Sequence, residues 1–273
     1  MGSMRTALLT ACLAGIVLLP QAEPSTARAT AARVAQAKPT IVLVHGAWAD
    51  GSGWNGVIRR LQADGYTVIA PPDPLRGAII DGQYMAGLLR AIRGPIVLVG
   101  HSYGGAVITN AATGNPSVRA LVYVDAFVPD LGESVLQLAT ARPGSCLGGD
   151  PTKVFDIVPA APEGDADLYI KRELFPGCFA SELSVADAAV LASEERPITL
   201  SALALPSGVP AWRTIPSWYV LGTADRVVPP AEQRFMAERA HARITEVAAM
   251  HPAMISHPDV VTDVILDAAR EAG

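Results

Sequence analysis

The residues with the clearest chemical meaning lie at positions 100–104, where Gly-His-Ser-Tyr-Gly fits the pattern G-x-S-x-G. In this pattern a serine stands on a tight turn between a strand and a helix, and the flanking glycines leave room for the turn. Residues 96–99 are apolar and an Ala-rich segment follows the motif, so both the strand and the helix are indicated. The positive end of that helix would favour an anion beside Ser102. We predict Ser102 as a nucleophile; the alternative is an ordinary glycine-rich turn.

A serine nucleophile needs a general base, and the chain has only five histidines. They are His45, His101, His241, His251 and His257. We expect His45 to shape the loop after the first strand, His101 to point away from the nucleophile, and His241 to lie at the surface. His251 follows the last strand, at the sheet edge where ligands bind, and it fits the chain order of nucleophile, then acid, then histidine. His251 is therefore the predicted base; His257 is the alternative, although a cap of the last helix suits it better.

The base needs a carboxylate that holds its tautomer and stabilises its cation. Asp225 follows the apolar strand 219–221, and Asp125 follows the apolar strand 122–124, so both should lie at the same edge of the sheet. Asp225 keeps the chain order of nucleophile, acid and base, and it comes from the strand expected beside the one that leads to His251. We predict Asp225 as the acid. Asp125 remains the alternative, with a turn cap as its simpler role.

Two backbone N–H groups are needed to bind the oxyanion of an acyl-transfer intermediate. Tyr103 directly follows the nucleophile and should supply one. The loop after the first strand, His-Gly-Ala-Trp at 45–48, should supply the other, and we choose Ala47 within it. The alternative for this loop is a tight turn without a chemical role.

Buried strands and amphipathic helices alternate along the chain and would position these residues. Continuous apolar runs indicate parallel strands buried on both faces, and helical spacing of apolar residues indicates the helices between them. The expected strands are residues 41–44, 66–70, 95–99, 120–124, 218–221 and 244–247; the expected helices include 54–61, 85–92, 106–111, 229–240 and 258–269. This alternation predicts an α/β fold with a mostly parallel, doubly wound sheet.

The strand–helix rhythm breaks between about residues 131 and 214, where Pro, Gly and acidic residues are frequent. We interpret this segment as a helical lid inserted into a domain that spans residues 40–273. Short helical patterns such as 185–192 support the helical interpretation. The lid also contains Cys146 and Cys178, an even pair that favours a disulfide if the protein is exported, with two buried thiols as the alternative.

Residues 1–39 are predicted to lie outside the folded domain. Residues 1–3 have the composition of a cloning scar ahead of a start at Met4. Arg5, the apolar run 7–19 and later small-residue sites then follow the layout of a signal peptide, and a linker completes the segment. The apolar run is too short to span a bilayer, which takes about 20 residues. We expect a secreted or periplasmic protein without stable membrane insertion; the position of Cys12 argues against a lipoprotein.

Composition narrows the classes of function. Half of the 273 residues are hydrophobic, 17% are charged and the net charge is −5, so a large core is expected. No basic run is present to bind phosphates, which argues against nucleic acid as a partner. The histidines and cysteines lack the spacing of metal ligands, and no G-x-G-x-x-G follows a strand, so we expect neither a metal nor a cofactor. The oligomeric state is not readable from the sequence.

From about Thr40 to the C-terminus, the chain resembles the small α/β-hydrolase group that includes plant methyl-salicylate-type esterases, the related hydroxynitrile lyases and many bacterial esterase-like proteins. The resemblance rests on residues 44–48, 100–104, 222–225 and 251–254. It implies an α/β-hydrolase fold and a Ser-His-Asp triad. An export signal and a lid cysteine pair distinguish this chain from the plant esterases and argue against a plant-hormone-like substrate.

The resemblance also separates two chemistries. The lyases of this group carry a Thr where this chain has Gly46, and a Lys where it has Pro252. The lack of both favours hydrolysis of small, largely apolar carboxylic esters through an acyl-enzyme on Ser102. Lyase-like or other non-hydrolytic chemistry on the same fold remains an alternative, as does a ligand-binding protein with slow turnover. The sequence leaves open whether an ester, a lactone or an amide is cleaved.

Overall fold

A computed structural model of the protein describes residues 38–160 and 163–273. The cloning scar, the signal peptide and nearly all of the linker expected at the N-terminus lie outside these residues. The described residues all belong to one compact unit. None of the described helices is long and apolar enough to cross a membrane.

Six parallel strands form the central sheet, in the order β2-β1-β3-β4-β8-β9. The pairing registers include Val42 with Leu98 between β1 and β3, and Val124 with Val220 between β4 and β8. The strands are β1 (Thr40–Val44), β2 (Val68–Ile69), β3 (Ile96–His101), β4 (Val118–Val124), β8 (Ser217–Gly222) and β9 (Arg243–Val247). The predicted strands are thus present, but β2 has only two residues, because Pro71 and Pro72 cannot continue the ladder of backbone hydrogen bonds.

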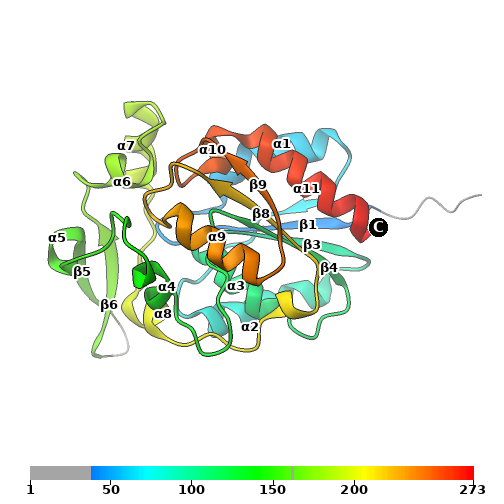
Figure 1. Ribbon diagram of the computed structural model, residues 1–273, viewed down its shortest axis with the longest axis horizontal. Coiled ribbons are helices and arrows are strands. Elements are labelled where there is room, and N and C mark those ends of the chain that lie inside the picture. Colours follow the sequence, from blue (N-terminus) through cyan, green and yellow to red (C-terminus); the bar gives the residue numbers. More distant parts are fainter. Residues whose placement is uncertain (1–37, 161–162) are drawn as a thin grey trace, which may run out of the picture. The chain divides into compact units, whose positions relative to one another are not determined.

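Helices cover both faces of this sheet, so its central strands are almost entirely buried (Figure 1). In β3, Ile96 and Leu98 pack into one core cluster, while Val97 and Val99 pack into the other. The first cluster lies under α2, α3 and α9, and the second under α1 and α11. These helices are α1 (Asn55–Ala63), α2 (Ala78–Ala91), α3 (Tyr103–Ala111), α9 (Pro230–Arg239) and α11 (Pro258–Ala272). The prediction of a doubly wound α/β fold is confirmed.

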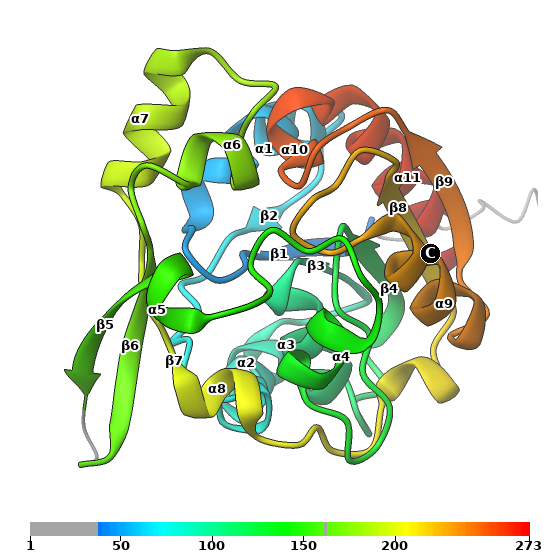
Figure 2. The same cartoon turned by 60° about the vertical axis from the view of Figure 1, so that its left-hand side comes forward.

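The chain between β4 and β8 forms a cap on the side where the parallel strands end (Figure 2). The sequence predicted a helical lid, but the cap also contains a second, antiparallel sheet in the order β5-β6-β7. Apolar and polar residues alternate along β6, which buries Leu168 and Ile170 and is typical of a half-buried strand. The cap consists of α4 (Val135–Ala141), α5 (Pro151–Val154), β5 (Phe155–Ala160), β6 (Asp165–Ile170), α6 (Phe175–Phe179), α7 (Val185–Ser193), β7 (Ile198–Thr199), α8 (Leu200–Ala204) and η2 (Ala211–Arg213).

A disulfide joins Cys146 to Cys178 inside the cap. Cys146 lies in the loop between α4 and α5, and Cys178 lies in α6. The same loop is tied to the main domain, because the Cys146 N–H donates to the carbonyl oxygen of Arg226 at 2.7 Å. The disulfide therefore links the loop between α4 and α5 to α6, and the hydrogen bond links the same loop to the main domain.

Candidate active site

Ser102 stands between the end of β3 and the start of α3, on the turn that the sequence predicted. Its backbone has φ 52° and ψ −123°, a strained conformation for a residue other than glycine. The neighbouring glycines make the turn possible. A Cβ on Gly100 would lie 2.5 Å from the carbonyl oxygen of Gly104, and a Cβ on Gly104 would lie 2.6 Å from that of His45. Side chains larger than hydrogen would therefore displace the turn.

The structure brings the three predicted side chains of the triad together. His251 Nε2 lies 2.9 Å from Ser102 Oγ, and His251 Nδ1 lies 2.8 Å from Asp225 Oδ2. His251 is in the loop after β9 and Asp225 is in the turn after β8, so neighbouring strands deliver the two side chains to the elbow. Both side chains are fully buried. With Nδ1 donating to the carboxylate, Nε2 is left to accept the serine proton.

The carboxylate of Asp225 has all of its oxygens engaged. Oδ1 accepts from the backbone N–H groups of Val227 and Val228, at 2.7 and 3.1 Å. Oδ2 accepts from His251 and also from the side-chain amide of Gln233, at 2.7 Å. A buried negative charge is tolerable when it is hydrogen-bonded in this way. Gln233 could not be identified from the sequence, because it lies eight residues after Asp225 and in a helix.

None of the other four histidines makes a hydrogen bond to Ser102 within the described residues. His101 is engaged with the loop of His251, because its Nε2 donates to the carbonyl oxygen of His251 at 3.0 Å. His45 Nδ1 donates to the Gly46 carbonyl oxygen at 2.8 Å, and burial lowers the pKa of His45. Burial, with the nearby His251, lowers the pKa of His101 well below its usual value. His241 is exposed just after α9, and His257 directly precedes α11 at its N-cap position.

In the described chain, Asp125, the alternative acid, makes no hydrogen bond to the side chain of His251. Its Oδ1 accepts from the Gly222 N–H at 2.7 Å, and its Oδ2 accepts from the Ala253 N–H at 3.3 Å. Asp125 therefore connects the turn that carries Asp225 to the segment that follows His251. Burial, together with the negative charge of Asp225, raises the pKa of Asp125 well above its usual range.

Ala47 and Tyr103, whose N–H groups are predicted to bind the oxyanion, both line one cavity together with Ser102. Tyr103 opens α3, and the first N–H groups of a helix have no partner within it. In the described part of the chain, neither N–H has a hydrogen-bond partner. The loop that contains Ala47 is bound to the cap through the next residue, because the Trp48 N–H donates to the carbonyl oxygen of Arg196 in the cap at 3.1 Å.

Side chains of the cap contact the His251 loop directly. The ring of Phe179 lies edge-on to the imidazole of His251, with centroids 4.9 Å apart. Glu182 Oε1 accepts from the backbone N–H of Met250 at 3.0 Å and from Ser256 Oγ at 2.6 Å. Sequence reasoning did not predict these contacts, because Phe179 looked like any apolar residue of the cap and Glu182 lies in an irregular loop. They show that the cap takes part in positioning His251.

The cavity above Ser102 has a volume of about 440 Å³ and extends between the sheet and the cap. Its inner wall is aromatic, since Trp48 and Phe155 stack there with centroids 5.7 Å apart. Of the described residues that line it, none carries a charged side chain. At its outer end are Leu136, Ile157 and Leu200, each more than two-fifths exposed. The cavity therefore suits an uncharged, largely apolar molecule.

Comparison with known proteins gives a consistent result. Residues 41–264 match the Alpha/beta hydrolase family. The chain is 29% identical over 257 residues to an alpha/beta hydrolase of Aspergillus novofumigatus, covering 86% of this chain and 98% of that one. It is 29% identical over 254 residues to a pyrethroid hydrolase of Sphingobium wenxiniae, covering 84% of this chain and 87% of the relative. The solved structure of polyneuridine aldehyde esterase has the same fold, with a TM-score of 0.72 at 21% identity over 85% of this chain and 99% of that one.

Proposed function

The chain belongs to the alpha/beta hydrolase family, and we propose that within it the protein is a serine esterase for small, largely apolar carboxylic esters. One observation carries the proposal: Ser102 Oγ, His251 and Asp225 form a buried hydrogen-bonded series with separations of 2.9 and 2.8 Å. That series is the arrangement that converts a weak hydroxyl into a nucleophile. Relatives named as a hydrolase and an esterase add support.

In the first half of the proposed reaction, Ser102 Oγ attacks the carbonyl carbon of the ester while His251 Nε2 takes the serine proton. The carbonyl oxygen becomes an anion, which the N–H groups of Ala47 and Tyr103 stabilise. Asp225 stabilises the imidazolium that has formed. The tetrahedral intermediate then collapses: the bond to the alkoxy oxygen breaks, His251 donates its proton to that oxygen, and the alcohol leaves an acyl group on Ser102.

In the second half, a water molecule takes the place of the alcohol. His251 removes a proton from this water as it attacks the acyl carbonyl, and the same two N–H groups bind the oxyanion again. Collapse of the second intermediate returns the proton from His251 to Ser102 Oγ and releases the carboxylic acid. The product is ionised at neutral pH, and a cavity without charged lining residues binds it poorly, which favours its release.

The first experiment is hydrolysis of p-nitrophenyl esters from acetate to octanoate by the wild-type protein and by Ser102→Ala. Loss of the nucleophile should lower kcat by at least about 10⁴-fold, and the dependence on chain length should reflect the size of the cavity. Equal release of p-nitrophenol by both proteins would refute the esterase proposal. Release of cyanide from cyanohydrins by the wild type would instead support lyase chemistry.

A second experiment tests the class of substrate. The neutral p-nitrophenyl butyrate and the anionic p-nitrophenyl hemisuccinate have acyl chains of the same length. Burial of an unpaired carboxylate costs several kcal/mol, so we expect kcat/KM for the hemisuccinate to be lower by about 100-fold or more. Comparable values for both esters would contradict selection for uncharged substrates.

We further propose that the protein is exported, as a secreted or periplasmic enzyme. The signal-peptide layout of residues 4–29 supports this proposal, and so does the pairing of Cys146 with Cys178. Mass spectrometry of the protein recovered from the periplasm or the medium should give a chain without its first residues. An uncleaved chain found only in the cytoplasm would refute export.

A further inference from the structure

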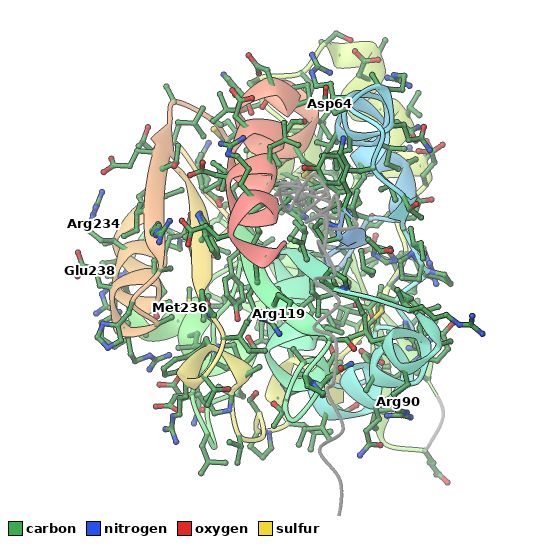
Figure 3. All side chains as sticks on the ribbon, turned by 90° about the vertical axis from the view of Figure 1, so that its right-hand side faces the viewer. Asp64, Arg90, Arg119, Arg234, Met236 and Glu238 are labelled. Atoms are coloured by element: carbon green, nitrogen blue, oxygen red, sulfur yellow. A yellow bond between two sulfur atoms is a disulfide. The ribbon has the colours of Figure 1, made fainter. Side chains whose placement is uncertain are left out.

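Gln233 lies on the inner face of α9, next to the proposed active site. The helix turns Arg234 and Glu238 outward, while Met236 points toward the sheet (Figure 3). Gln233, Met236 and Ala237 have the three- and four-residue spacing of one helix face, and all three are buried. A glutamine side chain without solvent contact must satisfy its amide within the protein.

The amide group of Gln233 donates to two acceptors. Nε2 lies 2.7 Å from Asp225 Oδ2 and 2.9 Å from the carbonyl oxygen of Val228. The amide oxygen has no hydrogen-bond partner in the described chain. Both of these oxygens accept hydrogen bonds and cannot donate them. The amide nitrogen of Gln233, and not its oxygen, must therefore face them. The side chain is thus held by two contacts in the orientation that aims a donor at Asp225.

The oxygen that Gln233 contacts is the one that also accepts from His251 Nδ1. The opposite oxygen is held by backbone N–H groups, so Gln233 is the only side chain besides His251 that hydrogen-bonds to this carboxylate in the described chain. Rotation of the carboxyl plane about its Cβ–Cγ bond would move Oδ2 off the line to the imidazole, and Gln233 adds a second hydrogen bond on the Oδ2 side that opposes this rotation. A hydrogen bond from a neutral donor to a charged acceptor is also among the stronger kinds.

We propose that Gln233 is a positioning residue, which holds Asp225 Oδ2 against His251 and thereby sets the tautomer and orientation of the base. This inference rests on the proposed serine esterase function. Gln233 is not among the residues that line the cavity, so an ester bound there would not touch it. Its contribution should therefore appear in kcat, whereas KM should stay nearly constant.

The test replaces Gln233 by Met, which has a similar length and volume but no donor. For p-nitrophenyl butyrate, kcat of Gln233→Met should fall by about 10- to 100-fold, since a hydrogen bond to a charged group is lost, with KM within about twofold of wild type. Gln233→Ala is the second variant, because it removes the donor without filling its space. Thermal melts show that each variant is folded before it is assayed.

Ala237→Gly is the matched control. It weakens the same face of α9 by about 1 kcal/mol without touching Asp225, so it should lower the melting temperature and leave kcat nearly unchanged. Proton NMR adds a readout that does not depend on turnover. The His251 Nδ1 proton, bonded to a carboxylate, should give a resonance far downfield, and Gln233→Met should shift or broaden it while Ala237→Gly does not.

Two results would overturn the inference. The first is a kcat within twofold of wild type in a folded Gln233→Met or Gln233→Ala protein. The second is a loss of activity that Ala237→Gly reproduces, since that would be a structural effect of α9. If the wild type hydrolyses no ester, the proposed function fails, yet the NMR comparison still shows whether Gln233 acts on the pair of Asp225 and His251.

Discussion

Phe179 and His251 lie edge to face, with ring centroids 4.9 Å apart, although one belongs to the cap and the other to a loop of the main domain. Phe179 is in turn stacked on Phe175 of the same helix, with centroids 4.9 Å apart. The imidazole is therefore enclosed by an aromatic side chain on one side and by His101 on another, with centroids 4.7 Å apart. Packing of this kind limits the rotation of the base and excludes water from it.

Phe179→Leu should lower kcat by about threefold to tenfold, since an aromatic pair contributes about 0.5–1.5 kcal/mol beyond the area that it buries. The measurement is steady-state hydrolysis of p-nitrophenyl butyrate beside a thermal melt. Phe175→Leu is the control, because it removes a ring from the same helix without touching His251. If both variants lose activity equally, the stability of α6 and not the contact with His251 is responsible.

Removal of the disulfide should destabilise the protein and loosen the cavity. The bond closes a loop with a sequence separation of 32, for which the chain-entropy argument gives about 3–4 kcal/mol. The loop of Cys146 contains Ser145 and Leu147, which line the cavity, so Cys146→Ala with Cys178→Ala should also raise KM. Melting curves of this double variant and of reduced wild type provide the measurement. Two titratable thiols in the denatured, unreduced wild type would contradict the bond itself.

Gly104→Ala should be strongly destabilising, because the added Cβ would lie 2.6 and 2.7 Å from the carbonyl oxygens of His45 and Val44. Overpacking against backbone costs about 1–3 kcal/mol, and the displaced loop carries Ala47, so kcat should fall as well. Urea unfolding and ester hydrolysis measure the two effects. Gly177→Ala meets no atom within 4 Å and should change neither. Normal stability of Gly104→Ala would show that α3 can move away from β1.

Glu195 should make stability depend on pH. Burial raises the pKa of Glu195 to about 7, whereas an unfolded glutamate has a pKa of about 4.3. The folded state therefore binds the proton more tightly, and stability falls as pH rises from about 4.3 to 7. Glu195→Gln lacks this dependence. The free energy of unfolding of the variant minus that of wild type should therefore be larger at pH 8 than at pH 5. Urea unfolding at both values is the measurement; an equal difference at both would refute the titration.

The sequence was sufficient for the residues whose roles depend on local pattern. The turn at Ser102 needs glycines and a strand before it, and both can be read directly from residues 96–104. The position of His251 followed from chain order and from the edge of the sheet. The apolar runs of β1, β3, β4 and β8 identified the sheet, because strands that are buried on both faces have no polar positions to obscure the pattern.

Contacts between distant elements could not be read in this way. Gln233, Phe179 and Glu182 reach the site from a helix, a cap helix and a loop, and only the packing of those elements decides which side chain faces inward. The cap sheet was missed for another reason. Alternation along β6 was visible, but short strands among Pro, Gly and acidic residues are hard to distinguish from irregular chain.

The cap leaves the sheet after β4 and returns at β8, and these two strands are direct neighbours. A segment inserted between neighbours can be exchanged for one of different length without changing strand order, so selection can act on substrate range separately from the chemistry. Both half-cystines lie inside this segment, and the crosslink would be inherited with it. A cap transplanted from another protein would still need an aromatic ring at the place of Phe179 and a hydrogen-bond acceptor at the place of Glu182. Without these two contacts, the new cap would not fit the loop of His251.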